Sequence, residues 1–303
     1  MSLLRTLFFV GLLLITFFCF DINDGKLAGA ETYDFESLGV NGFINGQDNW
    51  VDQSGQGQAV ISLDTTGNGT KVVRHMPTVA INQDAFVTRA NDASFSFPHF
   101  YASQTEALIQ FDLNGEYVAL FALGHDVNGD GRLTADPFGD GSGGEVGPAF
   151  GTYGTGVGNR NFALRPASLE QAMVVELGQG NSGNDWYRMQ LRMDFTTNEE
   201  SGVGSLFYMN ISDGDTTFQP VLELQGIGLG LDNLHAGAGP GAWDTMWLQL
   251  RTGGSGSIPA ADNLVPNPSA IPEPTSLALL LVGTFFLGAI RRPTSSRRSH
   301  RLT

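Results

Sequence analysis

The chain has 303 residues, of which 31 are Asp or Glu and 16 are Lys or Arg, and its formal net charge is −15. Residues 31–270 alone carry 28 acidic and nine basic side chains, a net charge of −19, which argues against nucleic acid and anionic lipid as partners of this region. Cys19 is the single cysteine, so a disulfide within one chain is excluded.

The first 30 residues have the pattern of a signal peptide. Residues 1–5 form a short positive region, residues 7–20 are apolar, and Ala28-Gly29-Ala30 supplies the small residues that a signal peptidase reads. We expect signal peptidase to act on the chain, and the mature protein to start at Glu31 and be exported. The polar stretch at 21–26 leaves an uncleaved first helix as the alternative.

Short segments of strand-like residues follow, separated by Asn-Gly, Asp-Gly and other turn signals. In the first half of the chain we predict strands at 59–63, 71–74, 107–113 and 117–124.

A long glycine-rich loop is predicted between Asp126 and Asn161. Its start places oxygen-bearing side chains at alternate positions before a glycine, which suits a hard cation such as calcium. The candidate ligands are Asp126, Asn128, Asp130, Asp136 and, through its backbone carbonyl, Arg132.

This segment resembles the calcium loops of EF-hands and dockerins, and the resemblance implies a calcium site that orders the loop. It departs from them at the twelfth position, where Pro137 replaces the bidentate acid. Asp136, Asp140 or Glu145 could supply the missing carboxylate. The alternative is a set of plain hairpin turns, which Asp-Gly and Asn-Gly pairs also form.

In the second half, strands are predicted at 173–177, 186–195, 204–211, 221–224 and 243–251, with a last short strand at 262–265. The clearest is 186–195, where one face carries Tyr187, Met189, Leu191, Met193 and Phe195. Helices of twelve or more residues are not predicted outside the termini. We therefore expect an all-β fold, a two-sheet antiparallel β-sandwich of the jelly-roll, concanavalin A-like type, over 31–252, and 253–270 as last strand and linker.

Four short sequence segments resemble those of exported sandwich domains of the concanavalin A-like, laminin G-like kind. They are Tyr33-Asp-Phe-Glu-Ser37, Asn45-Gly-Gln-Asp-Asn-Trp50, Asp185-Trp-Tyr-Arg188 and Ala261-Asp-Asn-Leu264. The resemblance implies a module that binds carbohydrate or protein at its loop ends and sometimes holds calcium.

Two tryptophans have the neighbours that carbohydrate recognition needs, an aromatic face beside amide or carboxylate groups. Trp50 follows Gln47 and Asp48, and Trp186 follows Asp185. The alternative for both is packing in the core. Trp243 and Trp247 lie four residues apart in a predicted strand, so we expect both in the core on the same side.

Catalytic motifs are absent from the sequence. Glu-x-Asp-x-x-Glu, His-Glu-x-x-His and Gly-x-Ser-x-Gly do not occur, and the prediction is a protein that is not an enzyme. Carboxylates from distant strands could still meet, which keeps a polysaccharide-active hydrolase or lyase as the alternative.

The C-terminal segment, 271–303, combines three features in a fixed order. Pro272, Glu273 and Pro274 precede an uncharged run from Leu277 through Leu280 and Phe285 to Ile290, and Arg291 and Arg292 follow at once. This pattern resembles the PEP-CTERM sorting domain of bacterial envelope proteins. The resemblance implies that an exosortase recognises the Pro-Glu-Pro residues, while the apolar run anchors the chain in the membrane. The alternative is an ordinary tail anchor.

Together these features predict an exported, non-catalytic protein of the cell envelope or extracellular matrix that binds glycan or matrix components. A purely structural matrix or adhesion protein, stiffened by calcium, is the further alternative.

Overall fold

The computed structural model describes residues 32–53, 59–64, 70–76, 84–97, 106–114, 117–134, 143–154, 161–167, 173–176, 185–196, 202–252 and 258–266. The chain divides into two units, Met1–Ser269 and Ala270–Thr303. The predicted signal peptide and the whole predicted sorting segment lie outside the described residues. Within the described part, no helix has the length and apolar character that crossing a membrane requires.

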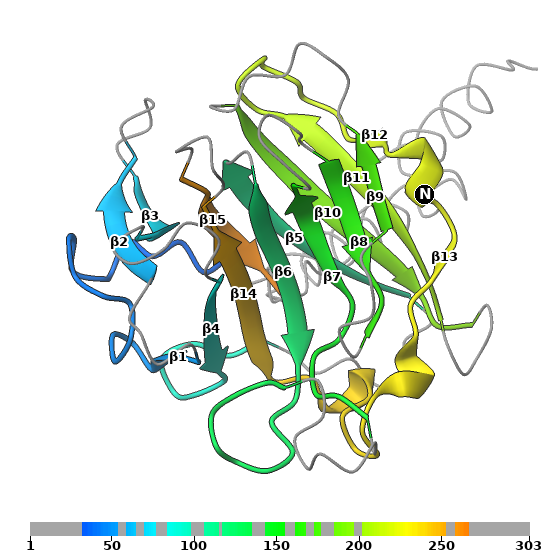
Figure 1. Cartoon of the computed structure of the whole chain (residues 1–303), viewed down its shortest axis with the longest axis horizontal. Coiled ribbons are helices and arrows are strands. Elements are labelled where there is room, and N and C mark those ends of the chain that lie inside the picture. The colour runs from blue at the N-terminus through cyan, green and yellow to red at the C-terminus, as the bar shows by residue number, and fades with distance from the viewer. Residues whose placement is uncertain are drawn as a thin grey trace, which may run out of the picture. The chain divides into compact units, whose positions relative to one another are not determined.

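Two antiparallel sheets form the fold (Figure 1). The seven-stranded sheet has the order β1 (Trp50–Asp52), β4 (Asp84–Ala90), β14 (Thr245–Arg251), β6 (Val118–Gly124), β7 (Ala149–Tyr153), β8 (Asn161–Arg165) and β9 (Met173–Glu176). The eight-stranded sheet includes the short strand β13 (Ile227–Gly228) beside β11. Its main order is β12 (Gln219–Pro220), β11 (Val203–Asn210), β10 (Trp186–Asp194), β5 (Glu106–Asn114), β15 (Ala260–Val265), β3 (Lys71–His75) and β2 (Ala59–Leu63). The predicted two-sheet antiparallel sandwich is confirmed.

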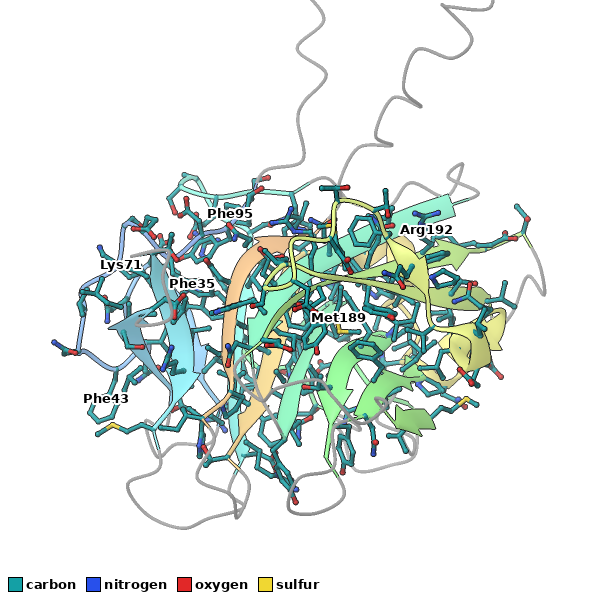
Figure 2. All side chains as sticks on the ribbon, turned by 90° about the horizontal axis from the view of Figure 1, so that it is seen from above. Phe35, Phe43, Lys71, Phe95, Met189 and Arg192 are labelled. Atoms are coloured by element: carbon teal, nitrogen blue, oxygen red, sulfur yellow. The ribbon has the colours of Figure 1, made fainter. Side chains whose placement is uncertain are left out.

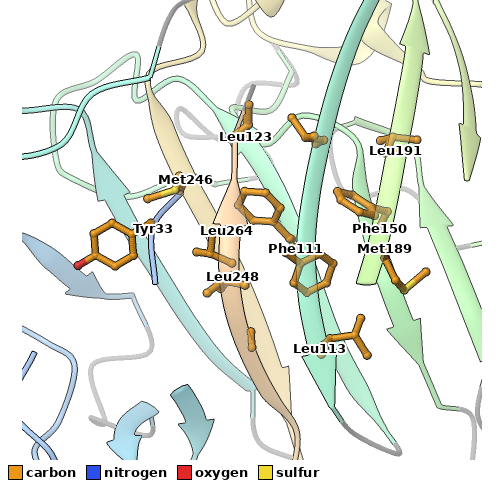
Figure 3. Close-up of a cluster of buried hydrophobic side chains, with 14 of the residues drawn as sticks. Tyr33, Phe111, Leu113, Leu123, Phe150, Met189, Leu191, Met246, Leu248 and Leu264 are labelled. Carbon is orange, nitrogen blue, oxygen red and sulfur yellow. The ribbon is translucent and has the colours of Figure 1, made fainter. Parts of the chain in front are cut away.

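The core lies between the sheets and follows the predicted alternation. Tyr187, Met189, Leu191 and Met193 of β10 are each at most 3% exposed, and Met189 lies in the interior of the side-chain view (Figure 2). They meet aromatic side chains of both sheets, including Phe111 and Phe150, whose ring centroids are 5.2 Å apart (Figure 3). Removal of this apolar surface from water is the main stabilising contribution.

A second buried cluster covers the outer face of the seven-stranded sheet. It contains Val118, Leu120 and Ala122 of β6 together with Trp247 of β14. Because β6 is buried on both faces, its sequence is a continuous apolar run rather than an alternating one. Trp243 belongs to the core between the sheets and precedes β14, so the expectation that Trp243 and Trp247 share one side is wrong.

Several elements differ from the predicted ones. Residues 222–224 form a 3-10 helix, η2 (Leu222–Leu224), instead of a strand; further short 3-10 helices are η3 (Leu231–Asn233) and η4 (Pro240–Ala242). Strand β7 lies inside the predicted long loop. It needs Gly151, because a Cβ there would lie 1.9 Å from the Ala119 carbonyl oxygen.

Strand β15 is an interior strand of the eight-stranded sheet. It pairs with β5 on one side and β3 on the other, and Tyr33 near the start of the described chain bridges to Leu264. The sandwich therefore extends to residue 265, into the segment predicted to be largely linker.

Candidate functional site

A pocket of about 110 Å³ lies on the outer face of the eight-stranded sheet, with room for several water molecules. Strands β5, β10 and β15 form its floor, because the residues that alternate with its lining, Leu113, Tyr187 and Ala261, point into the core. Its aromatic, charged and amide-bearing lining comprises Asp64, Asp112, Trp186, Arg188, Asp262 and Asn263.

Asp112 and Arg188 form a two-bond ion pair across the pocket floor. They are direct partners in the register of β5 and β10. Arg188 Nε donates to Asp112 Oδ1 at 2.7 Å and Nη2 donates to Oδ2 at 2.8 Å. This fork geometry is the strong form of an arginine–carboxylate contact. Asp112 is buried, whereas the Arg188 side chain keeps 34% of its surface exposed.

Asp262 lies opposite Asp112 on the neighbouring strand β15. Burial raises the pKa of Asp262 to about 8, and the negative charges of Asp112, Asp34 and Glu36 add to the effect. A carboxyl group with this pKa is mainly protonated at pH 7, so Asp262 brings an O–H donor to the pocket.

Asn263 connects the two carboxyl groups. Its Nδ2 donates to Asp112 Oδ2 at 2.9 Å and to Asp262 Oδ2 at 3.3 Å. The register of β15 against β5 shifts between Asp262 and Val265, and Asn263 has a φ of 49°. Asparagine tolerates this left-handed conformation better than most residues, and the irregularity brings its amide to the pocket.

Trp186 is half-buried at the start of β10 and lines the same pocket. Its backbone N–H donates to Ser212 Oγ at 2.9 Å and its carbonyl accepts from Ile211 N–H at 2.9 Å, which fixes the beginning of the strand. The structure therefore brings this predicted ligand-binding residue together with charged and amide groups.

Trp50 lies elsewhere, inside the core. It is 1% exposed and packs against Tyr33 and Phe35, with ring centroids 5.6 and 5.7 Å away. Its indole presents no face to a ligand in solution, so the sequence-based suggestion of ligand binding has no structural basis at this residue.

The predicted calcium loop is a tight turn in which side-chain oxygens accept backbone N–H groups. Asp126 accepts from Gly129 and Gly131, each at 2.6 Å. Asn128 accepts a hydrogen bond from the N–H of Asp130, and Asp130 accepts one from the N–H of Arg132, both at 2.9 Å. Asp136 lies outside the described residues.

Glu145 closes this loop from the far end. It is fully buried, and its carboxylate accepts from the N–H groups of Val127 at 2.9 Å and Thr134 at 3.1 Å. Among the described residues, no three His, Cys, Asp or Glu side chains come together as a metal site.

Sequence reasoning missed most of the pocket. Asp262, Asn263 and Arg188 appeared only within predicted strands and within segments that resemble sandwich domains, without a role of their own. Asp112 gave no signal, because it is 76 residues from its partner Arg188. The one indication available in the sequence was that Asp112 is a polar residue between apolar neighbours in a predicted strand.

Comparisons with known proteins add little to the geometry. No protein-family model and no curated protein matches the chain. Among solved structures, the T. cruzi calreticulin globular domain aligns with a TM-score of 0.43 and 9% identity, over 86% of this chain and 95% of that chain. At this level the similarity says nothing about ligand or activity.

Proposed function

We propose that this protein is an exported, non-catalytic sandwich protein that binds carbohydrate at the pocket beside Trp186. The observation that carries the proposal is the meeting of a half-buried indole with Asp112, Arg188, Asp262 and Asn263 in one pocket on the outer face of a sheet.

The chemistry of the pocket suits a ligand with many hydroxyl groups. An indole offers an apolar face to the C–H groups of a sugar ring. Arg188 has N–H donors beyond the two that bind Asp112, the Asn263 side-chain carbonyl is an acceptor, and protonated Asp262 supplies an O–H donor. A sugar hydroxyl both donates and accepts, so this mixture matches it better than a pocket of one charge sign would.

The hydrogen bonds that Asp112 already accepts support binding over catalysis. Its two oxygens already accept from Arg188 and Asn263, which makes it a poor nucleophile or base. A glycosidase needs a carboxylate able to attack or to activate water.

A polysaccharide-active hydrolase or lyase is the second candidate, and one observation favours it. Asp112 and Asp262 face each other beside Trp186, and the high pKa of Asp262 is the property of a general acid. Release of reducing ends or unsaturated sugars from a polysaccharide panel, lost in Asp262→Asn, would establish this candidate in place of the first.

Export and sorting complete the proposal and rest on the sequence. Signal peptidase removes residues 1–30, and an exosortase-type enzyme recognises Pro272, Glu273 and Pro274, while the apolar segment from Leu277 to Ile290 holds the chain in the membrane before Arg291. Intact-mass measurement of protein from envelope and medium tests this part. Masses that retain both termini in both fractions would refute it.

Calcium belongs to the proposal as a stabilising ligand of the loop that begins at Asp126. The support is the alternation of Asp126, Asn128 and Asp130 within a tight turn.

The binding claim is tested with a panel of polysaccharides and with extracellular matrix from the producing cells. We expect the purified protein to be retained by at least one polysaccharide and released by the matching oligosaccharide. Absence of retention on every glycan and on the matrix would refute it.

A further inference from the structure

The pocket on the outer face of the eight-stranded sheet includes three carboxyl groups in its lining, and two of them are paired with arginines. Arg188 binds Asp112 through two hydrogen bonds, and Arg74 Nη2 lies 3.4 Å from Asp64 Oδ1. The third carboxyl group, that of Asp262, forms no ion pair with any described arginine or lysine. One acidic group of the pocket therefore lacks a cation.

The surroundings of Asp262 favour a positive partner. Asp262 is 5% exposed, and its oxygens accept from two neutral donors of Asn263, the backbone N–H at 2.8 Å and Nδ2 at 3.3 Å. Burial opposes its ionisation most strongly, and the negative charges of Asp112, Asp34 and Glu36 oppose it further. A cation brought by a ligand would offset these costs, because a buried carboxylate is stable only when it is paired.

Arg188 does not fill this role. Its hydrogen bonds to Asp112 are the largest influence that raises its pKa, and the charge of Asp262 adds a smaller one. Both Nε and Nη2 of Arg188 are bound to Asp112. The positive charge of Arg188 is therefore balanced by Asp112 and leaves Asp262 without a counter-ion.

Trp186 offers a second contact for a positive group. It is half-buried and lines the same pocket, and it precedes Arg188 by two residues on β10, so both side chains lie on the outer face. The face of an indole attracts cations more strongly than that of any other aromatic side chain. An indole and an unpaired carboxyl group in one pocket suit an ammonium ion.

The charge of the surrounding chain acts in the same direction. Residues 31–270 have a net charge of −19, which attracts cations and repels anions. The pocket, at about 110 Å³, has room for several groups of the size of water, and thus for an ammonium group with the adjoining part of a sugar ring. An acidic sugar would meet repulsion here, and a neutral sugar would leave Asp262 without a cation.

We propose that the carbohydrate bound in this pocket carries a free amino group, whose ammonium form pairs with the Asp262 carboxylate and lies against the face of Trp186. The inference rests on the proposed function, because it names the class of sugar for the same pocket. Asp262 gives up its proton to the solvent when the ammonium group binds, while Arg188 and Asn263 remain available to the hydroxyl groups.

Calorimetric titration of the full chain tests the inference with three β-1,4-linked oligosaccharides of equal length, built from glucosamine, N-acetylglucosamine and glucose. The three share a backbone, and only the first carries amines, which are protonated at about pH 6. Each titration is run in two buffers of different ionisation enthalpy, so that protons released on binding are counted. The proteins are the wild type, Asp262→Asn and Glu223→Gln.

Glu223→Gln is the matched control for the general attraction between an acidic protein and a cation. Glu223 is exposed and lies outside the pocket lining, so its replacement removes one full negative charge from the surface. Asp262→Asn removes little charge at about pH 6, because the pKa of Asp262 is about 8. A larger effect of Asp262→Asn than of Glu223→Gln therefore identifies a local contact.

We expect the wild type and Glu223→Gln to bind the glucosamine oligomer about tenfold more tightly than the other two, with release of a proton. Asp262→Asn should bind the three oligomers with similar affinity and release no proton.

Three results would overturn the inference. The first is a wild type that binds the glucosamine oligomer no more tightly than the other two. The second is a preference that survives undiminished in Asp262→Asn. The third is binding of the glucosamine oligomer by the wild type without proton release, which decides the matter if Asp262→Asn does not fold. Binding of the neutral oligomers with no preference for amines leaves the proposed function intact, whereas absence of binding to every carbohydrate refutes both.

Discussion

Asp112 and Asp262 stand opposite each other in the register of β5 and β15, and one amide group, Asn263 Nδ2, donates to both. Two neighbouring carboxyl groups avoid mutual repulsion when one of them holds a proton. Arg188 binds Asp112 in its ionised form, so the proton resides on Asp262. The pocket therefore contains one ion pair and one neutral acid.

Replacement of Asp262 by Asn should remove a pH dependence of stability. The pKa of Asp262 in the folded protein, about 8, exceeds the ordinary value near 4. The stability that Asp262 contributes is therefore fully present below pH 4 and is lost as pH rises toward 8. Between these limits the wild type should lose up to about 1.4 kcal/mol per pH unit relative to Asp262→Asn. Urea unfolding at several pH values above 5 measures the difference. Parallel curves for the two proteins would contradict the assignment.

Arg89 should be a major contributor to stability. Its side chain is fully buried, lies over the rings of Tyr33 and Phe95, and pairs with Asp48 and Asp92. Arg89→Met leaves two partly buried carboxylates without their cation, and we expect a loss of about 3–5 kcal/mol.

Denaturant unfolding tests this expectation, with Arg192→Met as the exposed control. Arg192→Met should change stability by less than about 1 kcal/mol. Equal losses in the two variants would show that the burial of Arg89 has no energetic consequence.

Gly151 should not tolerate alanine. Its φ is 148°, and a Cβ would collide with the Ala119 carbonyl oxygen on β6. We expect Gly151→Ala to lose about 3 kcal/mol or more. Gly214→Ala is the matched control, because Gly214 also has positive φ but has open space around it, and it should lose about 1–2 kcal/mol. Calorimetry of both variants makes the comparison.

Calcium should raise the unfolding midpoint relative to a chelator. A ligand that binds the folded state alone, at 100 times its Kd, stabilises by about 2.7 kcal/mol. Asp130→Asn retains a side-chain oxygen for the Arg132 N–H but removes a charge, and should reduce the increment. An unchanged wild-type midpoint would remove calcium from the account.

The sequence predicted strands where residues alternate and also where they are uniformly apolar. Strand β10 alternates between apolar residues that meet the core and polar residues on the outer face, and β6 is a continuous apolar run buried on both faces. Strands β4 and β7 were not predicted. Strand β4 carries a buried charge, Arg89, among its inward residues, and β7 contains Gly151, whose role depends on a strand distant in sequence.

The pocket was predictable in one residue, Trp186, because local composition identified it. Its partners come from three strands, and the pairing of Asp112 with both Arg188 and Asp262 is a property of sheet order. Short-range patterns contain no information on that order. Trp50 and Trp186 have similar local sequences, yet Trp50 lies in the core and Trp186 lines the pocket.

The measurement that tests the central claim most directly is calorimetric titration of three proteins with an oligosaccharide that the glycan panel identifies. The proteins are the wild type, Trp186→Ala and Phe43→Ala, where Phe43 is an exposed aromatic residue, 53% accessible, outside the pocket lining (Figure 2). We predict that Trp186→Ala weakens binding about tenfold or more, a loss of about 1.4 kcal/mol, while Phe43→Ala binds as the wild type does. Equal affinities for Trp186→Ala and the wild type would contradict the claim that carbohydrate binds at this pocket.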